Sequence, residues 1–121
     1  MKEYTTDLLR NVALVGHQGA GKTSLAESLL FNTGAVTRMG KVEEGNTVAD
    51  FDEDERSRTL SIYSSLLPIE FDGHKINIID APGFVDFQGE AKNAVRVADA
   101  AVVVVDAVAG PEVGTELAFD F

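Results

Sequence analysis

Hydrophobic residues fall into short blocks along the chain, separated by glycine-rich and polar stretches. The first block, NVALVG at residues 11–16, is apolar and ends in glycine, which predicts a buried strand. In the next stretch, KTSLAESLLFNTG at residues 22–34, leucines at helical spacing predict a helix, and Gly34 offers a stop. The expected order is therefore a strand, a glycine loop and a helix.

Residues 35–57 lack a clean period and contain two glycines and many acidic residues. We expect a long loop there, with room for a short helical piece. Loops of this length in compact domains are usually either functional or disordered. The acidic residues fit a solvated surface as well as a segment that changes conformation, so the pattern leaves both interpretations open.

The second half of the chain predicts a hairpin, a helix and a further strand. Two strand-like runs within residues 60–80 flank Asp72-Gly73, a strong turn signal, and the second run ends at Asp80. Small apolar residues share one face of an expected helix over residues 89–98. Residues 99–110, DAAVVVVDAVAG, are apolar on both faces, which is typical of a central parallel strand and predicts a buried one.

The last residues, 111–121, open like a helix, because Pro111 stands near the start and acidic side chains follow it. Strands and helices therefore alternate along the chain around one hairpin. This order predicts an α/β fold with a mostly parallel sheet and one antiparallel hairpin strand.

Composition narrows the classes of function. The chain has 121 residues, enough for one domain, and no cysteine, which excludes disulfides and cysteine-bound metals. A formal net charge of −10 argues against binding nucleic acid by bulk electrostatics. The N-terminus lacks a signal peptide's apolar core, and no apolar run approaches the roughly 20 residues of a membrane span. We therefore expect a cytoplasmic protein that binds neither DNA nor membranes.

The stretch GHQGAGKT, residues 16–23, matches the pattern G-x-x-x-x-G-K-[ST] at every fixed position. Glycines let successive backbone N–H groups face one anion, and the following helix directs its positive end toward it. Lys22 is expected to reach the outer phosphates of a nucleotide, and the Thr23 hydroxyl to bind Mg²⁺. The alternative is a structural glycine turn with an exposed lysine. The expected strand before the loop and helix after it favour the phosphate site.

A second motif, NIIDAPGFVDF, occupies residues 77–87. Asp80 ends a predicted buried strand, where such a fold needs a carboxylate near Mg²⁺, and Gly83 has no side chain to keep its N–H from a terminal phosphate. Alternatively, Asp80 only caps a strand and Pro82-Gly83 form an ordinary turn. The two motifs together favour a nucleotide-controlled switch, with the long loop between them ordered by phosphate and metal.

Three segments resemble translational GTPases, and most closely elongation factor G and its second bacterial paralogues. They are NVALVGHQGAGKTSLAESLLFNTGA, DAPGFVDFQGE and DAAVVVVDAVAGPEVGTE, and they cover most of residues 11–118. The resemblance implies a three-layer P-loop NTPase sandwich, binding of GTP and Mg²⁺, GTP hydrolysis, and action with the ribosome. VEEGNTVADFDEDE and RTLSIYSS resemble the family's first switch, which implies Ser61 as a further Mg²⁺ ligand.

Together the motifs and the resemblance define the candidate site. The candidate nucleotide-binding residues are Gly16, His17, Gln18, Gly19, Ala20, Gly21, Lys22, Thr23, Ser24, Asp80 and Gly83. The candidate metal ligands are Thr23, Ser61 and Asp80. Within this set, the backbone of His17 is expected to matter more than its ring.

Some positions depart from the family's pattern. Phe84 stands where the family carries a histidine that positions the attacking water, so efficient hydrolysis is in doubt while binding is not. Ser61 replaces a threonine, and Thr59 replaces a glycine just before it. Gly19 stands where many relatives carry an aspartate.

The family's guanine-reading element, Asn-Lys-x-Asp, does not occur in this sequence. We therefore expect residues 1–121 to be the N-terminal portion of a GTP-binding domain whose later strands, guanine-reading loops and downstream domains lie outside this chain. The leading interpretation is a GTP-hydrolysing switch acting in translation, with the isolated chain poorly active or inactive. The alternatives are a GTP-binding module with little hydrolysis, and a piece without selective nucleotide binding.

Overall fold

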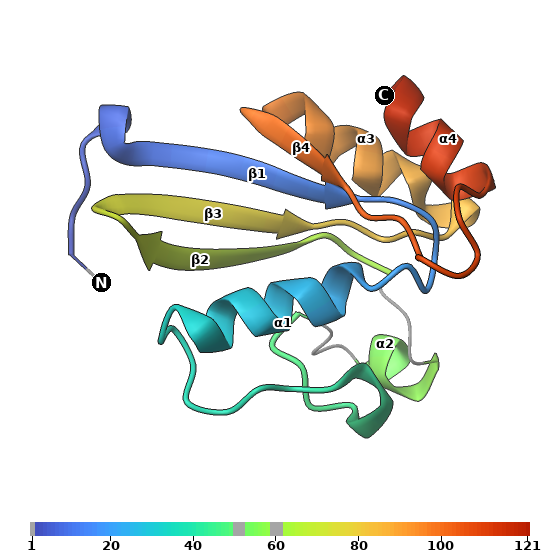
Figure 1. Ribbon diagram of the computed structural model, residues 1–121, viewed down its shortest axis with the longest axis horizontal. Coiled ribbons are helices and arrows are strands. Elements are labelled where there is room, and N and C mark those ends of the chain that lie inside the picture. Colours follow the sequence, from blue (N-terminus) through green and yellow to red (C-terminus); the bar gives the residue numbers. More distant parts are fainter. Residues whose placement is uncertain (1, 50–52, 59–61) are drawn as a thin grey trace.

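The computed structural model describes residues 2–49, 53–58 and 62–121. A four-stranded sheet lies between one helix on one face and two helices on the other (Figure 1). The strands are β1 (Leu9–Val15), β2 (Ser65–Phe71), β3 (His74–Asp80) and β4 (Ala100–Val103). The covering helices are α1 (Lys22–Asn32), α3 (Gln88–Val97) and α4 (Val113–Asp120).

Short helical elements complete the described chain. They are the single 3-10 turns η1 (Thr6–Leu8), η2 (Val42–Glu44) and η3 (Val85–Phe87), and the short helix α2 (Glu53–Arg58). Both η2 and α2 fall in the acidic stretch after α1, so the expectation of a long loop with a short helical piece is confirmed.

The strand order is β2-β3-β1-β4. β1 runs parallel to β3, with Leu14 opposite Asp80, and parallel to β4, while β2 and β3 are antiparallel. The hairpin turns at Asp72 and Gly73, both with positive φ, as a tight turn between two strands requires. The predicted α/β fold with one antiparallel strand is confirmed, and the parallel register brings the C-terminal ends of β1 and β3 together.

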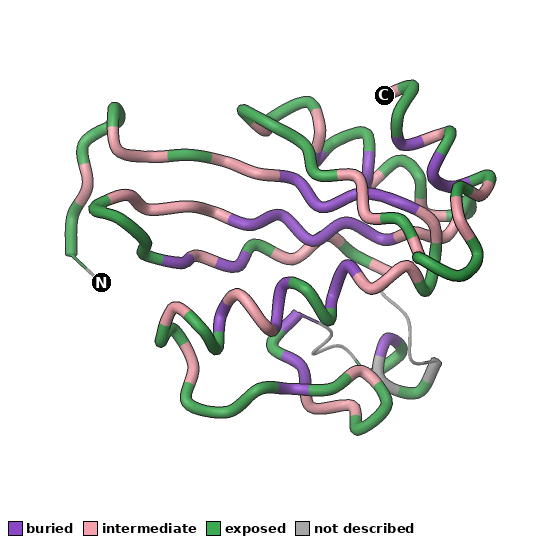
Figure 2. Tube along the Cα trace, in the orientation of Figure 1, coloured by how far each residue is buried: buried purple, intermediate pink, exposed green. Residues whose placement is uncertain are grey.

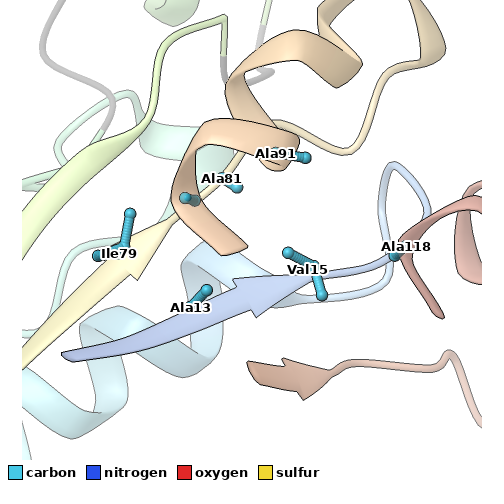
Figure 3. Packing of buried hydrophobic residues seen from close by; sticks show 7 residues of the cluster. Ala13, Val15, Ile79, Ala81, Ala91 and Ala118 are labelled. Carbon is cyan, nitrogen blue, oxygen red and sulfur yellow. The ribbon is translucent and has the colours of Figure 1, made fainter. Parts of the chain in front are cut away.

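Side chains alternate between two apolar layers because successive residues of a strand face opposite sides of the sheet. On the side of α3 and α4 the buried residues are mostly small (Figure 3): Ala13, Val15, Ile79, Ala81, Ala91, Ala94 and Ala118. On the side of α1 they are larger: Leu14, Ala26, Leu30, Ala49, Leu67, Ile69 and Ile78. Burial of β1 and β3 is concentrated in their C-terminal halves, so the best-packed part of the sheet supports the loops that follow (Figure 2).

The prediction of a buried strand over residues 99–110 is wrong. The strand is confined to β4, which pairs only with β1 within the described part of the chain, and its first three residues are exposed. The chain turns soon afterwards, because Asp106 Oδ1 accepts the backbone N–H groups of Val108 (2.7 Å) and Ala109 (3.0 Å). An apolar sequence predicts burial only where a second neighbour covers the strand, and β4 stands at the sheet edge.

No helix in the described part of the chain is long and apolar enough to cross a membrane.

Candidate nucleotide-binding site

The glycine loop connects β1 to α1, as the sequence predicted. Gly16 has φ of 147°, and a Cβ atom there would overlap the carbonyl oxygen of Val104, so only glycine fits beside the end of β4. Gly19 and Gly21 also have positive φ, and α1 begins directly after Gly21. The loop is therefore curled over the N-terminal end of a helix, the arrangement that favours anions.

Lys22 lies inside this loop rather than on the surface, with 6% of its area exposed. Its Nζ donates hydrogen bonds to the carbonyl oxygens of Gly16 (3.2 Å) and His17 (2.9 Å). Burial lowers the pKa of the Lys22 ammonium from its usual value, and the Asp80 carboxylate opposes that shift. The exposed lysine expected of a merely structural turn is not what the chain has.

Thr23 and Asp80 meet although they are 57 residues apart in the sequence. Thr23 Oγ1 donates a hydrogen bond of 2.7 Å to Asp80 Oδ2, and both side chains are buried. The parallel pairing of β1 and β3 produces this contact, because it places the last residue of β3 beside the start of the loop. A hydroxyl and a carboxylate are oxygen ligands of the kind that Mg²⁺ prefers, so the pair fits the metal expected here.

Gly83 approaches the loop closely from the β3 side. A Cβ atom at this position would overlap Lys22 Nζ and would lie 2.7 Å from the backbone nitrogen of Gln18. Position 83 therefore has room for an N–H group but none for a side chain. The next residue, Phe84, is partly buried, its ring lies 6.3 Å from that of Phe87, and it lines a shallow pocket with Gly16 and Gly83.

The other predicted residues of the loop are more open. Gln18, Gly19 and Ser24 are exposed, and Ala20 is partly buried. Ser61, the third predicted metal ligand, and Thr59 lie outside the described residues. The described residues contain no group of three or more His, Asp or Glu side chains that could hold a metal by themselves. A metal here would thus depend on oxygens beyond the side chains of His, Asp and Glu.

The ring of His17 makes contacts that the sequence did not predict. Its Nδ1 accepts the backbone N–H of Gly114 at 3.0 Å, and its Nε2 lies 2.5 Å from Glu112 Oε2. Gly114 leaves room for this ring, since a Cβ there would lie 2.7 Å from His17 Nδ1. The expectation that the His17 backbone matters more than its ring did not include this contact, by which the ring joins the loop to the first turn of α4. No sequence signal pairs a histidine with a helix so distant along the chain.

The segment between the two motifs is held by carboxylates, which the sequence did not single out either. Glu55, on α2, is only 2% exposed, and its Oε1 accepts the backbone N–H groups of Ile62 and Tyr63, each at 3.0 Å. Glu90, on α3, accepts the N–H of Ser64 at 3.0 Å. The interpretation of the acidic run as a solvated surface is thus wrong for Glu55.

The chain resembles known proteins over almost its whole length. Residues 7–120 match the family described as elongation factor Tu GTP binding domain. Ribosome-releasing factor 2, mitochondrial, from Scheffersomyces stipitis is 43% identical over 116 residues, 96% of this chain and 14% of that relative. Elongation factor G 2 from Streptomyces coelicolor is 44% identical over 116 residues, 96% of this chain and 17% of that relative.

The fold agrees with these sequence matches. A crystal structure of a protein from Thermus thermophilus superimposes with a TM-score of 0.91 and 47% identity, covering 93% of this chain and 17% of the other. The described chain thus spans about a sixth of the length of these relatives. On the match over residues 7–120 and the identity of these relatives, the chain belongs to the elongation factor Tu GTP-binding domain family, the translational GTPase domains of elongation-factor-G-like factors.

Proposed function

We propose that residues 16–24 and 80–83 bind the phosphates of GTP together with Mg²⁺, as the switch of an elongation-factor-G-like protein acting on the ribosome. The observation that carries the proposal is the convergence of Lys22, Thr23 and Asp80 at one end of the sheet. In a nucleotide-bound protein, the Lys22 ammonium would exchange its two carbonyl contacts for phosphate oxygens. The field of a bound triphosphate would then favour the charged lysine that burial disfavours.

Each residue has a separate role in this proposal. The backbone N–H groups of the loop and the N-terminus of α1 hold the phosphates, and Gly83 offers its N–H to the terminal one. Thr23 and Ser61 would contact Mg²⁺ directly and Asp80 would hold it through water. The metal, when bound, neutralises charge on the phosphates during transfer.

The wider role is proposed from the relatives. Two of them are named for releasing ribosomes and for elongation, so we assign the whole protein to a ribosomal step of translation. Residues 1–121 then form the N-terminal portion of a GTP-binding domain. The guanine-reading Asn-Lys-x-Asp element lies outside them in this assignment.

A second candidate function differs from the first in the rate of GTP hydrolysis. Phe84 presents a phenyl ring, which has no hydrogen-bonding group for a water molecule, so the protein would bind GTP and hydrolyse it slowly. In that case GTP marks a conformational state on the ribosome rather than supplying repeated turnover.

Single-turnover hydrolysis of GTP by the full-length protein, with and without ribosomes, separates the two functions. A Phe84→His variant restores an imidazole and is expected to raise ribosome-stimulated hydrolysis by about a hundredfold, the size of a general-base or water-positioning contribution. A Phe87→His variant is the matched control, because it adds the same ring one turn away. Equal rates for the parent and Phe84→His would contradict the assigned role of position 84.

A further inference from the structure

Glu27 is a carboxylate with no exposed surface, on the helix that follows the phosphate loop. Its Oε1 accepts the backbone N–H of Val48 in a short hydrogen bond and that of Ala49 at 3.4 Å. Glu27 stands four residues after Thr23, so the two side chains share one face of α1. One helical face thus carries both a candidate metal ligand and a contact to the distant segment 40–49.

The segment 40–49 closes around this carboxylate. A Cβ atom at Gly40 would lie 3.1 Å from Glu27 Oε2 and 2.7 Å from the carbonyl oxygen of Asn46, so Gly40 lies close against both the carboxylate and the later part of the segment. Asn46 Oδ1 also accepts the N–H of Lys41 at 2.8 Å. Figure 1 shows this segment running beneath α1, on the side away from the sheet.

The end of the segment is fixed in the core. Ala49 is 1% exposed, packs in the apolar layer between α1 and the sheet, and its carbonyl oxygen accepts the hydroxyl of Ser65 at 2.7 Å. Glu27 therefore holds the point at which the segment leaves the core. Any displacement of residues 48–49 must break its bonds.

Packing alone does not explain a buried glutamate at position 27. Its Oε2 is buried and has no hydrogen-bond partner within the described residues. Removing a carboxylate from water costs several kcal/mol unless its oxygens are well bonded, and an apolar side chain of similar volume avoids that cost. Ala26 and Leu30, on the same helix, are core residues. What a leucine cannot do is accept the two N–H groups.

We propose that Glu27 is a positioning residue that fastens the segment 40–49 to the face of α1 bearing Thr23, and so couples the order of that segment to the occupant of the phosphate site. The coupling rests on the proposed nucleotide function; the fastening does not. In the proposed function, a triphosphate with its metal orders the stretch between the two motifs, whereas a diphosphate needs mainly the loop. Glu27 thereby contributes to the preference for triphosphate over diphosphate.

Two variants of the full-length protein, studied without nucleotide by hydrogen–deuterium exchange, test whether Glu27 fastens the segment 40–49 to α1. Glu27→Leu removes both acceptors at nearly constant volume and is expected to speed exchange in peptides covering residues 47–49 by about tenfold or more. Glu27→Gln keeps an acceptor oxygen and is expected to stay within about threefold of the parent. Glu43→Leu changes an exposed carboxylate of the same segment and serves as the control. Unchanged exchange across α1 shows that each variant is folded.

The coupling is then read from dissociation constants for GDP and a non-hydrolysable GTP analogue. Glu27→Leu is expected to lower the analogue-to-GDP preference by about tenfold, and Glu27→Gln to restore most of it. If residues 47–49 exchange at the same rate in Glu27→Leu as in the parent, the fastening is refuted, whatever the nucleotide affinities are. Faster exchange with an unchanged nucleotide preference overturns the coupling. A parent that binds neither nucleotide, with Glu27→Leu still exchanging faster, refutes the proposed function and the coupling while the fastening stands.

Discussion

The phosphate loop, residues 16–23, and the connection between α1 and β2 are held in place by different chemistry. In the loop, backbone geometry and one buried lysine fix residues 16–23, and the partners lie within the loop, at the adjacent strand ends and at the start of α4. In the connection between α1 and β2, the carboxylates of Glu27, Glu55 and Glu90 accept isolated backbone N–H groups. The loop is thus built into the best-packed end of the sheet, whereas the connection depends on a few separable bonds. This difference is what a switch requires: a constant binding site beside a part that can be released.

Lys22→Ala acts on the phosphate loop and has the largest expected effect on GTP affinity. The variant loses the buried ammonium that would meet the outer phosphates, and truncating one partner of such a pair costs about 2–5 kcal/mol. In a titration, the affinity of the full-length Lys22→Ala variant for GTP should therefore be lower than that of the parent by about a hundredfold or more. Lys41→Ala is the control, since Lys41 is exposed and its ammonium lies 3.8 Å from Glu44 Oε1, away from the loop. Lys22→Ala binding GTP as tightly as the parent would remove Lys22 from the site.

Gly83→Ala probes the close approach to the same loop. The new methyl group would meet Lys22 Nζ and the Gln18 backbone, and such overpacking costs about 1–3 kcal/mol. We expect GTP affinity to fall by about tenfold. Gly89→Ala, on α3, is the matched control, because a Cβ there meets nothing within 4 Å. That variant should keep its affinity and gain slightly in thermal stability.

His17→Ala tests whether the loop needs its link to α4. The change removes the acceptor of the Gly114 N–H and the partner of Glu112, at a cost of roughly 1–3 kcal/mol for an unpaired buried donor. Part of that cost should appear in the loop, so GTP affinity falls by about fivefold and His17→Gln recovers some of it. His74→Ala, at the hairpin turn, provides the comparison. Equal affinities for the two alanine variants would confine the ring of His17 to a structural role.

Glu55→Leu acts on the other region and should have the smallest effect on binding. Its loss frees the N–H groups of Ile62 and Tyr63, so hydrogen exchange there should rise by about tenfold. GDP affinity should stay within about twofold of the parent, because the loop is untouched. A large loss of GDP affinity would show that the two regions are not separable, and the comparison would fail.

The loop, the α/β order and the hairpin could be predicted because each depends on local pattern. GHQGAGKT requires its glycines for backbone reasons, and Asp72-Gly73 sets a turn by itself. The meeting of Thr23 with Asp80 also followed from the sequence, since parallel strands end on one side of a sheet.

Other features could not be predicted from local pattern. The roles of Glu27 and Glu112 depend on bonds to residues far along the chain, and any carboxylate can accept any N–H group. The edge position of β4 depends on which neighbours a strand has, which its own apolar sequence does not state.

The central claim is that Thr23 and Asp80 hold a metal beside bound phosphates. Its most direct test is a titration of the full-length protein and of its Asp80→Asn variant with a fluorescent GTP analogue, each with Mg²⁺ and with Mg²⁺ removed by a chelator. We expect that removing Mg²⁺ weakens binding to the parent by at least about tenfold, and that Asp80→Asn loses most of this dependence. Binding by the parent that is equally tight with and without Mg²⁺, or no binding at all, would contradict it.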